Sequence, residues 1–134
     1  MSNNLCYLKS KYKKFNNPPK ARQIKQENDE GNIEYKYRLC KFSDSNRLNK
    51  LITQLNYRLY EGNGKAIYNV GFMDDGTPKG LPMDDILASL NNLYQMCAKI
   101  NANLESFRAF QGEQGYCANV YITKDIPNTL TLIP

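Results

Sequence analysis

Two pairs of adjacent aspartates are the residues best placed to do chemistry in this sequence. Asp74-Asp75 and Asp84-Asp85 could act as general acids and bases or hold a divalent cation in a nuclease site. However, Asp74-Asp75 precedes a glycine, as in a tight turn, and Asp84-Asp85 lies in the first turn of an expected helix, where the helix dipole favours acids. We therefore favour a structural interpretation of both pairs and predict no catalytic or metal-binding residues.

Histidine is absent from the chain, which limits the possible chemistry further. A serine or cysteine nucleophile activated by histidine and a mixed cysteine–histidine zinc site are both excluded. The four cysteines are widely spaced, with no C-x-x-C pair, and we interpret them as free thiols, at least two of them in the core. A zinc site made of all four is left open. They are Cys6, Cys40, Cys97 and Cys117.

The segment Gly62-Asn63-Gly64-Lys65 has the composition of a phosphate-binding loop but not its pattern. The P-loop motif requires a glycine and a hydroxyl residue where this chain has Leu59 and Ala66. The expected order here is also helix then strand, whereas a P-loop runs from strand to helix. We expect a helix end here and no cofactor bound by this chain.

Positive charge is concentrated near the N-terminus, although the whole chain has a net charge of +5. Residues 1–25 contain no acid, which leaves 11 basic and 13 acidic residues in 26–134. The basic segment is interpreted as a solvated leader or, as the alternative, an electrostatic arm that contacts RNA or the ribosome. Its basic residues are Lys9, Lys11, Lys13, Lys14, Lys20, Arg22 and Lys25.

The periodicity of apolar residues predicts an α+β domain in which two helices cover one face of a mixed or antiparallel sheet of about five strands. The expected order is β-α-β-β-α-β-β. Alternation predicts the first strand at 33–42, with Ile33 and Tyr35 inward and Glu34 outward. The helices are expected at about 46–61 and 83–100, and the other strands at 65–72, 77–81, 104–110 and 116–123.

Domain organisation follows from composition and length. Residues 1–32 are polar and contain Pro18-Pro19, so we expect a mostly disordered tail. We expect the accessory domain at 33–126 and a linker at 127–134. Apolar runs are too short for a membrane span, and the N-terminus lacks a signal-peptide core, so we expect a cytoplasmic protein.

One stretch, Glu61 to Leu81, carries a specific pattern of glycines and an Asp-Gly pair. It resembles the E-G-x-G-x-x-x-Y-x-x-G-x-x-x-D-G-x-x-x-G-L segment of the N-terminal domain of the GTP-binding protein 1 and 2 family, which are elongation-factor-like GTPases. The likeness extends over about 33–124. We expect the members of this pattern to shape turns: Gly62, Gly64, Gly71, Asp75, Gly76 and Gly80.

The resemblance implies a non-catalytic domain whose parent protein continues into a GTPase domain that binds GTP and magnesium. It also implies translation, ribosome rescue or mRNA turnover as the process, with the chain's own GTPase domain and the ribosome, tRNA or RNA as expected partners. None of the family's nucleotide-binding residues has a counterpart here. The hairpin from Val70 to Leu81 also resembles the Schlafen AlbA_2 type, and the alternative function is a stand-alone RNA-binding module.

Overall fold

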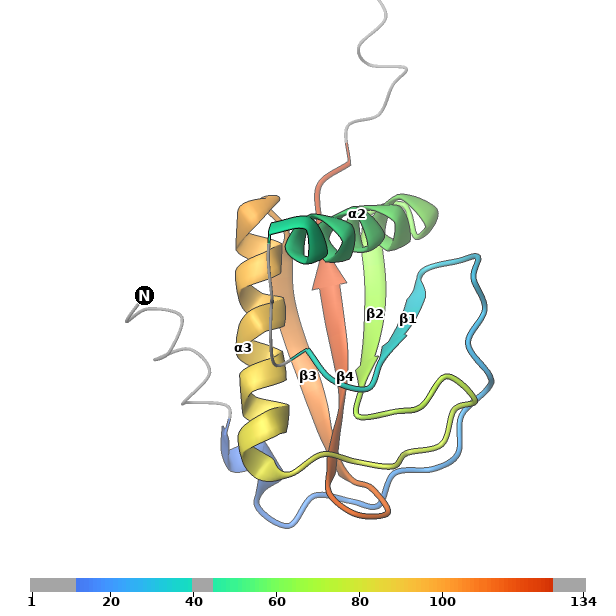
Figure 1. The fold of residues 1–134 in the computed structure, drawn as a ribbon, viewed down its shortest axis with the longest axis vertical. Coiled ribbons are helices and arrows are strands. Elements are labelled where there is room, and N and C mark those ends of the chain that lie inside the picture. The colour runs from blue at the N-terminus through green and yellow to red at the C-terminus, as the bar shows by residue number, and fades with distance from the viewer. Residues whose placement is uncertain (1–11, 40–44, 127–134) are drawn as a thin grey trace, which may run out of the picture.

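The computed structural model describes residues 12–39 and 45–126 (Figure 1). A 3-10 turn, η1 (Tyr12–Phe15), comes first. It is followed by β1 (Ile33–Lys36), α2 (Ser45–Glu61), β2 (Lys65–Val70), α3 (Met83–Lys99), β3 (Asn103–Gln111) and β4 (Tyr116–Thr123). No helix in this part of the chain is both long and apolar enough to cross a membrane.

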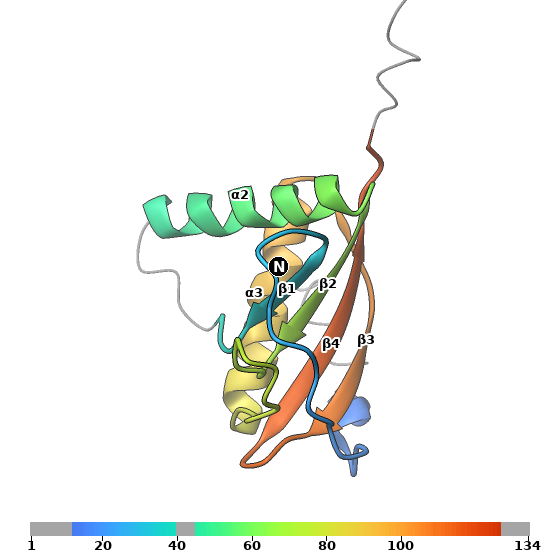
Figure 2. The same cartoon turned by 90° about the vertical axis from the view of Figure 1, so that its right-hand side faces the viewer.

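The four strands form one mixed sheet in the order β1-β2-β4-β3. β1 pairs parallel with β2, whereas β2 and β3 both pair antiparallel with β4. Both helices lie on the same side of the sheet, and the other side is the open face (Figures 1 and 2). The expected α+β class with two helices on one face is therefore confirmed, with four strands in the order β-α-β-α-β-β.

The predicted strand at 77–81 is not formed, and this is why the sheet has one strand fewer than expected. Only Leu81 makes a bridge, to Tyr116. The backbone carbonyls of Pro78 and Lys79 instead accept hydrogen bonds from the β3–β4 turn, from the N–H groups of Glu113 and Gln114. Pro78 has no N–H to donate to a ladder, which disfavours a continuous strand in this segment.

The helices form where their apolar stripes predict them, and glycine ends the first. Leu51, Leu55 and Leu59 bury one face of α2. The Gly64 N–H then donates to the Leu59 carbonyl at 2.7 Å, with Gly64 at φ +94°. A residue with a Cβ is strained at that φ, so glycine is the natural helix stop here. In α3 the buried residues are Ile86, Ser89, Leu90, Leu93, Met96 and Cys97.

The main core lies between the helices and the sheet. On the sheet side it contains Ala66, Tyr68 and Val70 of β2, with Val120 and Ile122 of β4. A smaller cluster lies on the open face, where Tyr35, Phe72 and Cys117 are buried against Ala21, Ile24 and Phe110. The second cluster exists because residues preceding β1 return across that face.

Residues 12–32, which we call the strap, pack on the domain. Phe15 is 2% exposed and stacks on Phe107, with 5.7 Å between ring centroids. Further along, the Ala21 N–H donates to the Gln111 carbonyl and the Gln111 N–H donates to the Pro19 carbonyl, at 2.8 Å each, and the Ile24 N–H donates to the Gly76 carbonyl at 3.0 Å. The expectation of a mostly disordered tail does not hold for these residues, because backbone bonding and one aromatic anchor compensate for a polar composition. Residues 1–11 of that tail and the linker expected at 127–134 lie outside the described residues.

The inward and outward faces of β1 also differ from the expectation. Ile33 is 41% exposed, whereas Glu34 is only 1% exposed. Glu34 lies beneath α2, where Arg58 compensates its charge: Arg58 Nε donates to Glu34 Oε1 at 2.8 Å. Alternation alone could not predict this arrangement, since an ion pair can occupy an inward position that the pattern assigns to apolar residues.

Candidate functional site

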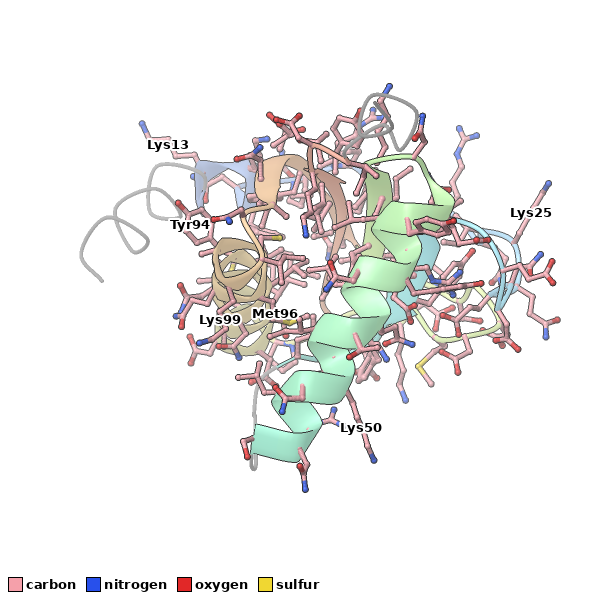
Figure 3. All side chains as sticks on the ribbon, turned by 90° about the horizontal axis from the view of Figure 1, so that it is seen from above. Lys13, Lys25, Lys50, Tyr94, Met96 and Lys99 are labelled. Carbon is pink, nitrogen blue, oxygen red and sulfur yellow. The ribbon has the colours of Figure 1, made fainter. Side chains whose placement is uncertain are left out.

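The described basic residues of the N-terminal segment do not form one patch. Lys13 and Lys25 lie on opposite sides of the molecule (Figure 3). Lys14 is tied to the domain, because its Nζ donates to the Phe107 carbonyl and lies 4.8 Å from the centre of the Phe107 ring. Lys20 and Arg22 are exposed and border a groove on the open face. Lys9 and Lys11 lie outside the described residues.

This groove has a volume of about 460 Å³ and lies between the strap and the open face of the sheet. Asn69 of β2, Asn119 of β4 and Arg108 of β3 form one row across three strands, because Asn119 is paired with both of the others. Apolar parts of the wall come from Phe72, Phe110 and residues of the strap. The lining is Pro19, Lys20, Ala21, Arg22, Ile24, Asn69, Phe72, Arg108, Phe110 and Asn119.

Polar groups of the groove are held in place by the fold. Asn119 Nδ2 donates to Asn69 Oδ1, and Asn69 is 4% exposed. The guanidinium of Arg108 lies 5.9 Å from the centre of the Phe110 ring. A fixed amide pair beside a cation and an aromatic ring can bind a planar ligand that carries negative charge.

The turn residues named from the sequence lie at points of close backbone approach. A Cβ on Gly76 would lie 1.9 Å from the Ile24 carbonyl oxygen, and one on Gly80 would lie 2.5 Å from the backbone of Gly115. Gly71 has φ +86°, and its N–H donates to the carbonyls of Lys36 and Tyr37. Asp75 Oδ1 accepts the Thr77 N–H at 2.9 Å, and the hydrogen bonds with Thr77 lower the Asp75 pKa.

The backbone N–H groups from Gly62 to Lys65 are all occupied by the chain itself. They donate, in order, to the carbonyls of Arg58, Tyr60, Leu59 and Gly62, at distances between 2.7 and 3.2 Å. A phosphate-binding loop presents such groups to its ligand. This segment therefore ends a helix and does not present an anion-binding nest.

The aspartate pairs lie in a surface turn and in the first turn of α3. Asp85 forms an ion pair with Arg38 at 3.0 Å. Across residues 12–39 and 45–126, no group of three or more His, Cys, Asp or Glu residues is arranged to hold a metal ion. Cys97 and Cys117 are free, buried thiols, and burial raises the pKa of each to about 12, so neither is a reactive nucleophile. Cys6 and Cys40 lie outside the described residues.

A buried ion cluster around Arg58 was missed by the sequence reasoning. Besides Glu34, the Arg58 guanidinium donates to the carbonyls of Gly31 and Asn28 at 2.9 Å each and lies 3.7 Å from Glu27. Burial and the nearby Glu34 carboxylate raise the Glu27 pKa to about 6. The available signal was spacing, because Arg58 falls on the apolar stripe of α2, seven residues after Leu51.

Fold and groove together define a small α+β domain with one polar, basic groove on the open face of its sheet. Its sequence is 40% identical over 95 residues to GTP-binding protein 2 of Mus musculus and, equally, to GTP-binding protein 2 of Homo sapiens. The aligned stretch covers 71% of this chain but only 15% of each relative. No family model and no solved structure matches the chain. The chain is thus related to a part of GTP-binding protein 2.

Proposed function

We propose that this chain is a non-catalytic, N-terminal accessory domain of an elongation-factor-like GTP-binding protein. The observation that carries the proposal is the 40% identity to GTP-binding protein 2 over 95 residues. The aligned stretch makes up 15% of that relative. In this proposal GTP and magnesium bind a separate GTPase domain, and the accessory domain acts beside it in translation, ribosome rescue or mRNA turnover.

The geometry of the Gly62 to Lys65 segment supports a role without nucleotide hydrolysis. Its four backbone N–H groups are occupied by backbone carbonyls, and the open end of a helix C-terminus carries the negative pole of the dipole, which repels phosphate. The aspartate pairs do not converge with other acids on one point in the described residues. Neither feature offers the Mg²⁺ and phosphate contacts of a GTPase.

Thermal unfolding with and without Mg²⁺-GTP tests the proposal. A ligand at one hundred times its Kd stabilises a protein by about 2.7 kcal/mol, which a melting curve detects easily. We expect no shift for the 134-residue chain and GTP hydrolysis by a chain extended to include the downstream reading frame. The Lys65→Ala variant is the matched control, because Lys65 is the residue that a phosphate at this turn would contact.

Two results would overturn the proposal. One is a GTP-dependent shift of the 134-residue chain that Lys65→Ala abolishes. The other is a downstream reading frame without a G-x-x-x-x-G-K-[ST] motif, because the GTPase domain would then be missing.

A further inference from the structure

The groove on the open face is bordered by positive charge that no described residue neutralises with an ion pair. Lys20 and Arg22 approach from the strap and Arg108 from β3, and no acidic residue lines the groove. Among the ion pairs formed by the described residues, none involves these three side chains. Three unpaired cations around one concave site favour an anionic ligand.

The floor of the groove offers more than charge. Because Asn119 Nδ2 donates to Asn69 Oδ1, the Asn69 amide nitrogen and the Asn119 amide oxygen have no partner within the described residues. They place a donor and an acceptor side by side. Phosphate and carboxylate groups present only acceptors, whereas the edge of a nucleobase presents both. The floor therefore matches the edge of a base better than it matches a phosphate or a carboxylate group.

Aromatic surface continues from the groove along β4. Phe110 lies in the groove beside Arg108. Tyr121, which is 38% exposed, follows Asn119 by two residues and so lies on the same face about 7 Å further along the strand. Bases stack on exposed aromatic rings and on guanidinium planes with little dependence on sequence.

We propose that this groove binds single-stranded nucleic acid, with one base on the Asn69–Asn119 pair and the next stacked on Tyr121. The phosphates lie against Lys20, Arg22 and Arg108. The volume of about 460 Å³ falls within the range of about 300–1,000 Å³ that is common for small-ligand sites, enough for one nucleotide unit. The site is separate from any GTP binding in the proposed function, so the two ideas fail independently.

Fluorescence anisotropy with labelled RNA and DNA octamers tests this site in the full 134-residue chain. We expect Arg108→Ala to weaken binding and to reduce the slope of log K against log salt by about 0.7, the value for one phosphate contact on a single strand. Tyr121→Ala should weaken binding at least about fivefold, because one stacked base is lost. The octamer that binds more tightly identifies RNA or DNA as the ligand.

Lys50→Ala is the matched control, because Lys50 is exposed on α2, which covers the opposite face of the sheet (Figure 3). It should change affinity less than twofold, and circular dichroism should show that all variants are folded. Three results would overturn the proposal: no binding of either octamer at low salt, equal losses in Arg108→Ala and Lys50→Ala, or competition by a glutamate octapeptide as strong as that by the octamers.

Discussion

Replacing Arg58 by methionine should strongly destabilise the domain, because it removes one half of a buried ion pair. The side chains of Arg58 and Glu34 are only 3% and 2% exposed. Methionine retains the apolar stem of arginine but leaves the Glu34 carboxylate buried, with the half-buried Lys36 Nζ at 3.7 Å as its remaining cation. Breaking such a pair costs about 3–5 kcal/mol. For a domain of this size that corresponds to a fall in Tm of at least about 10 °C.

The carbonyls of Gly31 and Asn28 also lose a charged donor, at 2.9 Å each. We add no further cost for them, because both residues belong to the strap surface, where water can replace the guanidinium. The total therefore stays near the cost of the ion pair. Since small domains have a total stability of about 5–15 kcal/mol, such a loss is a large fraction of the total, and the variant should unfold at a much lower urea concentration than the unmodified protein.

Urea unfolding followed by circular dichroism measures the change, and two further variants make the test specific. Arg108→Met, at an exposed site with no ion pair to any described residue, should cost less than about 0.5 kcal/mol. The double variant Arg58→Met with Glu34→Met should recover much of the loss, because apolar side chains can replace a buried pair with little cost. A loss below about 1 kcal/mol for Arg58→Met, or a double variant as unstable as the sum of its parts, would refute the reasoning.

Three further predictions concern the strap. Phe15→Ala should cost about 3–5 kcal/mol in urea unfolding and expose the strap to limited proteolysis, whereas a free tail would be cut equally in both proteins. Gly76→Ala should lower Tm, because φ is +90° and a Cβ would lie 1.9 Å from a strap carbonyl; an unchanged Tm contradicts the contact. Because the Glu27 pKa is raised from 4.5 to about 6, its favourable contribution is complete below about pH 4.5 and is lost as pH rises through about 6. Glu27→Gln should flatten this part of the pH–stability profile, and a profile identical to the unmodified protein would contradict the shift.

The elements with strong periodicity were predictable from the sequence, and the segments held by backbone bonds were not. Both helices and the last two strands lie within one or two residues of their expected positions, because their apolar residues recur every 3.6 residues in α2 and α3 and every 2 residues in β3 and β4. The segment at 77–81 has a strand-like composition, but its backbone groups bond to the β3–β4 turn. Local pattern contains no information about that distant partner.

The residues of the groove were likewise only partly predictable from the sequence. Lys20 and Arg22 could be selected as candidate contacts from charge alone, but nothing in their spacing indicated Arg108, which lies far away in sequence. Asn69 and Asn119 were not singled out, because asparagine within a strand has no distinctive pattern. They become neighbours only through the antiparallel register of β2 and β4. Sequence therefore identified the charge of the site and missed the residues that would recognise a base.

The strap links the groove to the stability of the whole domain. It begins at the aromatic anchor of Phe15, supplies Lys20 and Arg22 to the groove wall, and ends at the carbonyls that Arg58 holds. Both ends of the strap are fixed by buried side chains. The cations between them are therefore already held near the sheet, and less conformational entropy is lost when a ligand binds. A basic tail lacking these anchors would carry the same charge but would have to order itself on each encounter. The buried anchors thus give the polar segment between them a defined geometry, which composition alone did not predict.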